Sequence, residues 1–199
     1  MEHDAGGNEK IVGELTTIKR VGNSWVGVAP EFAANLEPAR KEAITNMIKL
    51  AQANRIIEAI FVRGRELKCR PLSVIVVEPG AKIKAFQKAD DSAMMRFEMA
   101  YGKAYAALAL GRSSSLVRMR TEERPLFMQY LMRASDEQIF PEGGGMLIRD
   151  KDGELLGAVG VTGDTQERDE ELAAHGIRAA GLKTDEDYAD LGTKVRLEN

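Results

Sequence analysis

Apolar residues recur every three or four positions in two long segments, which is the spacing of helices that bury one face. In residues 38–68 the recurring residues are Ile48, Ile56, Ile57, Ile60, Phe61 and Leu67, and we expect a helix that breaks near Asn46. In residues 93–110 they are Met94, Phe97, Tyr101, Ala104 and Leu108. The second segment is also rich in alanine and glycine, so a neighbouring helix or a subunit partner can approach it closely.

Two shorter segments towards the C-terminus also fit helices. Residues 122–132 form either a shorter helix or a mobile segment, with a proline in the first turn, where its missing N–H is tolerated. The serines at 113–115 are expected to break the helix that precedes it. Residues 165–180 follow Asp164, and Glu167 stands three positions after that aspartate. This spacing predicts Asp164 as the N-cap of the last helix.

Four runs are predicted to be strands: residues 72–77, which are rich in β-branched side chains, and residues 83–87, 146–149 and 154–162. Each pair of runs is joined by a four-residue turn, Glu-Pro-Gly-Ala at 78–81 and Asp-Lys-Asp-Gly at 150–153. Turns this short require antiparallel neighbours. A further hairpin is expected within residues 11–29, with Gly22 and Asn23 at its turn.

Composition narrows the class of protein. The 199 residues fit one domain with an appendage, and 28 basic against 31 acidic side chains give a net charge of -3, which disfavours a nucleic-acid partner. One cysteine, Cys69, and two histidines, His3 and His175, exclude an intramolecular disulfide and a His/Cys zinc site, so we expect no metal. No apolar run approaches the length of a membrane span. We therefore expect a cytoplasmic protein without a membrane partner.

Common catalytic signatures are absent from the sequence. Neither of the glycine-rich phosphate-binding patterns, G-x-G-x-x-G and G-x-x-x-x-G-K-[ST], occurs, and neither do H-E-x-x-H and G-x-S-x-G. A nucleophilic triad would depend on His175, for which an exposed helix position is the simpler interpretation. Cys69 is interpreted as a small, partly buried apolar residue rather than a redox group.

Several separated blocks together resemble one known family. They are PEGGGMLI at 141–148, ELLGAVGVTG at 154–163, DTQERDEELAAHG at 164–176, and Gly-Lys-Ala at 102–104. In this order they are similar to the GlcG/HbpS family, which includes the C-terminal domain of PduO-type adenosyltransferases and is described as haem-binding or haem-degrading. The turn at 78–81 departs from the family's D-x-G-G, and residues 87–90 depart from its R-M-D.

The resemblance covers residues 45–181 and implies an architecture. It implies an α+β fold with an antiparallel sheet of about five strands flanked by helices, in a subunit that forms symmetric homo-oligomers. Residues 1–44 are then an N-terminal extension that carries the predicted hairpin, and residues 182–199 are a polar C-terminal tail.

The candidate site residues each allow two interpretations. Lys103, which matches the family motif, and Arg96 can present positive charge to a ligand carboxylate, or they can reach water and pair with an acidic neighbour such as Glu98. Asp169 matches the family's D-E step, but the helix dipole also favours an acid there. Asp164 is a ligand contact or a cap.

Glycine is concentrated between residues 143 and 181. Candidate ligand-binding glycines are Gly144, Gly145, Gly160 and Gly163. Gly160 lies in the predicted strand at 154–162 and Gly163 directly follows it. Their absent side chains either leave room for a flat ligand or let a helix pack tightly on the sheet.

Two functions follow from these residues. The first is a GlcG/HbpS-like protein that binds haem, or another flat carboxylated small molecule, at a subunit interface. The second is a catabolic enzyme without a cofactor, a tautomerase, hydratase or lyase acting on an unsaturated carboxylic acid. In the enzyme Lys103 or Arg96 would bind the carboxylate or stabilise an enolate, and Asp169 or Glu142 would move the proton. The resemblance favours the first function, although the sequence marks out no axial ligand for haem iron.

Overall fold

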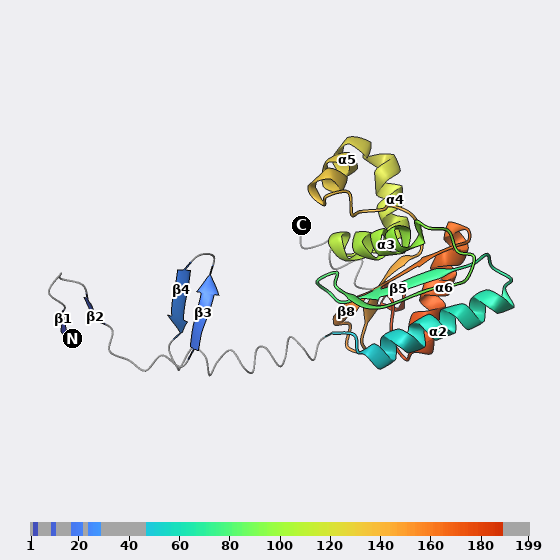
Figure 1. The fold of residues 1–199 in the computed structure, drawn as a ribbon. Coiled ribbons are helices and arrows are strands. Elements are labelled where there is room, and N and C mark those ends of the chain that lie inside the picture. The colour runs from blue at the N-terminus through green and yellow to red at the C-terminus, as the bar shows by residue number, and fades with distance from the viewer. Residues whose placement is uncertain (1, 4–8, 11–16, 22–23, 29–46, 189–199) are drawn as a thin grey trace. The chain divides into compact units, whose positions relative to one another are not determined.

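A computed structural model describes residues 2–3, 9–10, 17–21, 24–28 and 47–188 (Figure 1). The chain divides into two compact units, residues 1–45 and 46–199. In the first unit β1 (Glu2–His3) pairs with β2 (Glu9–Lys10), and β3 (Thr17–Val21) pairs with β4 (Ser24–Val28), both antiparallel. The turn expected at Gly22 and Asn23, and positions 38–46 of the first expected helix, lie outside the described residues.

The second unit is built on a four-stranded antiparallel sheet with strand order β6-β5-β8-β7. Its strands are β5 (Ser73–Val77), β6 (Ile83–Lys88), β7 (Gly145–Arg149) and β8 (Leu155–Thr162). The predicted α+β class with an antiparallel sheet is therefore confirmed. This sheet has four strands rather than about five, because the four predicted runs form it.

Helices cover both faces of the sheet (Figure 1). On one face α2 (Leu50–Glu66) and α6 (Gln166–Ala179) pack against each other and against the strands. On the other face α3 (Arg96–Leu110) lies across β8, β7 and β5. Successive side chains of β5 point to opposite faces of the sheet, so this strand packs against both helical layers. Val74 and Val76 face α2, while Ile75 and Val77 face α3.

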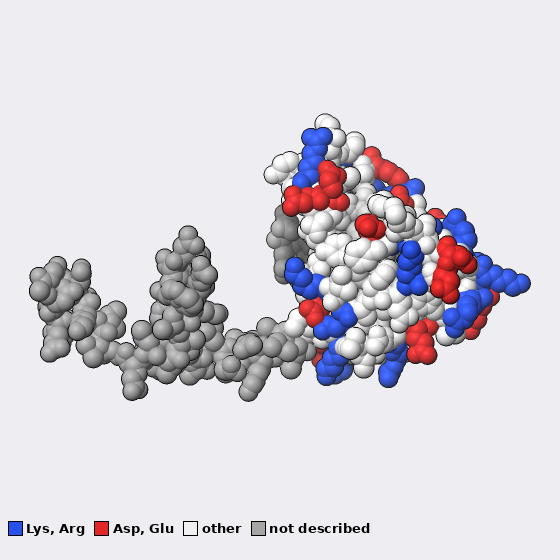
Figure 2. Space-filling model, viewed as in Figure 1, with Lys and Arg blue, Asp and Glu red and all other residues white. Residues whose placement is uncertain are grey.

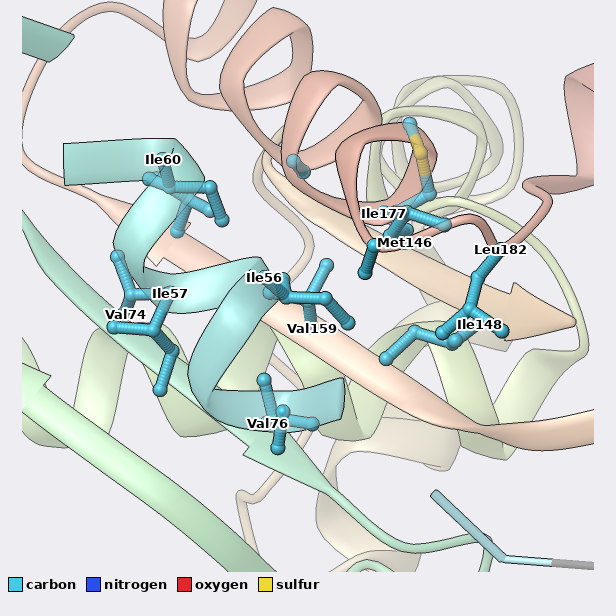
Figure 3. Packing of buried hydrophobic residues seen from close by; sticks show 14 of the residues in the cluster. Ile56, Ile57, Ile60, Val74, Val76, Met146, Ile148, Val159, Ile177 and Leu182 are labelled. Carbon is cyan, nitrogen blue, oxygen red and sulfur yellow. The ribbon is translucent and has the colours of Figure 1, made fainter. Parts of the chain in front are cut away.

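The larger hydrophobic core lies between the sheet and the pair α2 and α6. Figure 3 shows Ile56 and Ile60 of α2 close to Val74 and Val159 of the strands and to Ile177 of α6. These five side chains have no accessible surface. The three- and four-residue spacing predicted for α2 therefore does mark its buried face.

The segment after α3 differs from the prediction. The serines at 113–115 were expected to follow the end of the preceding helix, and α3 does end at Leu110; the helix predicted at 122–132 corresponds to α5 (Pro125–Ala134). The helix α4 (Ser114–Glu123), which packs against α5, was not predicted, and Ser113 precedes it as its N-cap residue, a position that serine favours. The division falls at Arg124, since a residue before proline avoids helical dihedrals.

Residues 182–188, the described part of the range assigned to a polar tail, pack along β7. Lys183 forms a β-bridge with Arg149, and the short 3-10 helix η1 (Asp185–Asp187) follows. The Tyr188 hydroxyl donates a hydrogen bond to the Asp150 carbonyl at 2.6 Å.

No helix among the described residues is long and apolar enough to cross a bilayer.

Candidate functional site

A buried ion pair joins α3 to α6 at the carboxyl end of β8. The Lys103 Nζ lies 2.7 Å from the Asp169 Oδ2, and the two side chains are 3% and 2% exposed. The same Nζ donates to the Val161 carbonyl of β8 at 3.0 Å. The Asp169 Oδ1 accepts the Asp164 N–H at 3.1 Å. One lysine therefore ties a helix, a strand and a second helix together.

Burial shifts the pKa values of both partners towards their neutral forms. Desolvation lowers the pKa of Lys103, although Asp169 and then Glu142 favour its charged form. Desolvation likewise raises the pKa of Asp169, against the opposing effect of Lys103. The pair is held by a short charge-assisted hydrogen bond in a site almost without solvent.

Gly144 allows this pair to form. Its φ is +110°, and a Cβ added there would lie 2.6 Å from the Val161 carbonyl oxygen and 2.7 Å from the Asp169 Cβ. The Lys103 Nζ would be 3.3 Å away. Any larger residue would therefore push apart the groups that hold the ion pair.

Asp164 is not the N-cap of α6. Thr165 occupies that position and its hydroxyl accepts the Arg168 N–H, so the predicted cap is displaced by one residue. The Asp164 carboxylate instead accepts the backbone N–H groups of Arg70 at 2.9 Å and Thr165 at 2.8 Å. Asp164 therefore fastens the loop before β5 to the start of α6.

We expect Asp164 to contribute stability that is lost in acid. The hydrogen bond from the Arg70 N–H, followed by that from Thr165, lowers the pKa of Asp164 from its ordinary value of 3.8. A depressed folded-state pKa gives stability that is complete above the unfolded value and disappears as pH falls through the folded one. Asp164→Ala should therefore cost roughly 1 kcal/mol at neutral pH, and this cost should become smaller as the pH falls below the ordinary aspartate pKa.

Urea denaturation of wild type and Asp164→Ala between pH 2 and 7 measures this difference. The remaining carboxylates cancel in the subtraction. A difference that does not change with pH would contradict the assignment.

Arg96 and Glu142 flank the ion pair. The Arg96 Nη1 donates to the Thr162 hydroxyl at 2.9 Å, at the end of β8, and the arginine is half-buried. Glu142 is half-buried too, and its backbone carbonyl accepts a hydrogen bond from the Ser114 hydroxyl. Both residues influence the charge of Lys103. The structure thus brings the predicted charged residues to one end of β8.

The glycines of the central strands make room for the protein itself. A Cβ on Gly160 would lie 1.9 Å from the Ala100 carbonyl oxygen, and one on Gly145 would lie 2.1 Å from that of Lys103. Gly145 and Gly160 are partners across β7 and β8. A Cβ on Gly163 would meet the Pro71 carbonyl oxygen at 2.6 Å. The packing interpretation accounts for these three positions, and a ligand role for them stays a prediction.

Several features of the site have no counterpart in the sequence analysis. Ser114, buried at the start of α4, accepts the Gly145 N–H at 2.7 Å and so joins α4 to β7. At the start of α3, Met94 and Met95 are exposed next to Arg96. The helical spacing assigned Met94 to the apolar stripe of the second helix, and this prediction was wrong, because α3 begins only at Arg96 and Met94 is 83% exposed. His175 is exposed on α6, as its simpler interpretation expects.

An open groove of about 620 Å³ lies away from the ion pair, between α2 and the end of β6. The side chains from α2 are Asn54, Glu58, Phe61 and Arg65, and residues 87–90 form the other wall. Acidic and basic side chains both line it. The predicted site residues are absent from its described lining.

A four-stranded antiparallel sheet between two helical layers, with a lysine–aspartate pair buried at its end, defines an α+β domain of a known type. The family model described as haem degrading protein HbpS-like matches residues 48–178. The chain belongs to this HbpS-like family, which confirms the resemblance seen in the sequence.

The individual proteins that this chain resembles share less than a third of its sequence. An uncharacterized 15.0 kDa protein in the dhaT-dhaS intergenic region of Citrobacter freundii is 29% identical over 126 residues, which are 63% of this chain and 87% of the relative. The crystal structure of a PduOC:haem complex has a TM-score of 0.63 at 21% identity, covering 69% of this chain and 98% of that chain. The crystal structure of Klebsiella pneumoniae protein ORFY has a TM-score of 0.61 at 24% identity, covering 67% of this chain and 90% of that chain. The two structures establish the fold.

Proposed function

We propose that this protein binds haem, or another flat small molecule with carboxylates, on the surface where β6 ends and α3 begins. Family membership supports a tetrapyrrole, and a protein of the same fold has been crystallised as a haem complex. The observation that carries the proposal is a group of five residues, which we call the α3 entrance: Phe86, Met94, Met95, Arg96 and Phe97.

The α3 entrance contains the groups that haem requires. Met94 and Met95 are 83% and 52% exposed, and a thioether can serve as an axial ligand of the iron. The adjacent Arg96 guanidinium can pair with a propionate. When bound, haem supplies an iron that exchanges electrons; the chain's own residues hold the macrocycle and its carboxylates.

Aromatic rings provide a surface for a flat ligand. The Phe86 and Phe97 ring centroids are 5.1 Å apart, and the row continues along α3 through Tyr101 to Tyr105 with spacings near 6 Å, namely 6.1 and 6.0 Å. Figure 2 shows that the surface between α2 and α3 is largely uncharged in this view. Partly buried aromatic rings next to one arginine suit a macrocycle with acidic substituents.

The exposure of Met94 and Met95 means that the described residues form one wall of such a site. A haem enclosed on both faces needs a second wall, and we place it on another subunit. We therefore propose that the protein is a homo-oligomer, as the sequence analysis expects, and that it is cytoplasmic.

The acid–base roles predicted for Lys103, Asp169 and Glu142 stay predictions. Lys103 and Asp169 contact each other, which gives these roles no added support.

Titration with haemin tests the proposal. We expect a shifted Soret band that saturates at a defined ratio to wild-type protein, and at least a tenfold weaker affinity in Met94→Leu, Met95→Leu. The control Met119→Leu removes a methionine of α4 that is 53% exposed, close to the 52% of Met95, and this variant should bind as wild type does. No Soret shift with wild type would refute haem binding, and unchanged binding by the double variant would refute the axial ligands.

The carboxylate partner can be tested separately. Haemin dimethyl ester lacks the charges that Arg96 would bind, so Arg96→Gln should weaken haemin binding several-fold but leave the ester unaffected. Equal weakening of both ligands would contradict a propionate contact.

A further inference from the structure

A buried threonine holds the arginine of the α3 entrance. Thr162, the last residue of β8, is 1% exposed, and its hydroxyl accepts the hydrogen bond from the Arg96 Nη1 at 2.9 Å. The same nitrogen lies 4.0 Å from the Met99 Sδ, which is a weak acceptor. Within the described part of the chain, the hydrogen bonds of this guanidinium therefore involve a single nitrogen, Nη1.

The position of Thr162 makes its contact with Arg96 rigid. The strand β8 lies between β5 and β7 in the sheet, and Thr162 is the cross-strand partner of Ser73 in β5. A threonine side chain is stiff because it branches at Cβ. The sheet therefore fixes the hydroxyl, and the hydroxyl fixes the guanidinium at the start of α3.

The partner of Arg96 is neutral, so the arginine keeps its charge for another anion. The sequence allowed an acidic neighbour such as Glu98 as the partner, but the guanidinium donates to the Thr162 hydroxyl. Asp169 pairs instead with Lys103 at 2.7 Å. A hydroxyl accepts a hydrogen bond without neutralising the cation that donates it. Thr162 thus orients Arg96 and leaves its positive charge uncompensated.

The remaining edge of the guanidinium suits a carboxylate. Among residues 47–188, the Nε and Nη2 groups of Arg96 make no hydrogen bond, because both of its bonds involve Nη1. The Nε and Nη2 N–H groups lie side by side and match the two oxygens of a carboxylate. A guanidinium that is already oriented loses less conformational entropy when the carboxylate binds.

We propose that Thr162 is a positioning residue of the α3 entrance, which orients Arg96 and thereby selects ligands that carry a carboxylate. This inference rests on the proposed function, since it takes haem or another flat carboxylated molecule as the ligand. Thr162 is almost inaccessible to solvent, so it acts on the ligand through Arg96.

Binding of haemin and of haemin dimethyl ester to Thr162→Val tests this role. Valine has nearly the shape of threonine but lacks the hydroxyl. We expect the variant to bind haemin roughly three- to tenfold more weakly than wild type does, and to bind the ester as wild type does. Thr162→Ser returns a hydroxyl to this position and should recover most of the preference for haemin. Far-ultraviolet circular dichroism checks that both variants are folded.

Ser73→Ala is the matched control. It removes another buried hydroxyl from the neighbouring strand, one that bonds to the Ser92 hydroxyl at 3.0 Å. The ratio of the haemin affinity to the ester affinity should remain that of wild type in this variant. A purely structural effect of losing a buried hydroxyl would change haemin and ester binding together.

A second comparison uses Arg96→Gln, in which the guanidinium is absent. Adding Thr162→Val to Arg96→Gln should not weaken haemin binding further, because the two residues act as one unit. Two results would overturn the role of Thr162: an unchanged affinity ratio in Thr162→Val, or the same loss of haemin affinity with and without Arg96. Wild type that binds neither ligand would instead refute the proposed function, so the two failures are distinguishable.

Discussion

Replacing Lys103 by methionine is expected to lower the free energy of unfolding by about 3–5 kcal/mol, because it leaves the Asp169 carboxylate buried without its partner. Methionine retains most of the side-chain length, so the lost charge dominates the effect. Urea denaturation at pH 7, followed by circular dichroism, measures the difference. Where the variant unfolds too readily, the same comparison is made in a stabilising osmolyte.

The chain offers a matched control for this substitution. Lys151 and Asp152 form an ion pair with the same 2.7 Å separation, but their side chains are 84% and 65% exposed. Lys151→Met should leave the stability unchanged, since solvent screens the pair. The double variant Lys103→Met, Asp169→Leu should recover part of the loss, because it leaves no unpaired charge, although the Asp164 N–H loses its carboxylate partner. If Lys103→Met and Lys151→Met behaved alike, the structural role assigned to the buried pair would be wrong.

Gly160→Ala is the second change with a large expected effect. The added Cβ would fall 1.9 Å from the Ala100 carbonyl oxygen, so α3 must move away from β8. Backbone cannot yield as a flexible side chain can, and we expect a loss of about 3 kcal/mol or more, at the upper end for overpacking. Thermal and urea unfolding both measure it.

Gly80→Ala is the control for this effect, because a Cβ at Gly80 would meet nothing within 4 Å. Its stability should change by less than about 0.5 kcal/mol. Equal stabilities for the Gly160 and Gly80 variants would contradict the close contact between α3 and β8.

The sequence predicts the regular elements well because their signals are local. The spacing of apolar residues identifies α2 and α3, and the turns at 78–81 and 150–153 identify the two strand pairs. The helix α4 was missed for an equally local reason: serines can end one helix or begin the next. Asp164 and Thr165 both suit an N-cap, and only the path of the loop before β5 decides between them.

The candidate site was harder to predict because its contacts are long-range. Lys103 and Asp169 were both selected from the sequence, but no spacing rule connects residues 66 positions apart. Each was therefore interpreted as a possible ligand group, whereas the structure shows them bound to each other. The glycines were ambiguous for a related reason. An absent side chain indicates space, and only the position of α3 shows what fills that space.

The strand order has a consequence for how the chain folds. The hairpins β5–β6 and β7–β8 are each closed by a short turn, but β5 pairs with β8 across about 80 to 90 residues of sequence. Local hairpins form in microseconds, whereas closing so long a loop carries a large entropic cost. We therefore expect the joining of β5 to β8 to limit the folding rate, with the Lys103–Asp169 contact forming after that step.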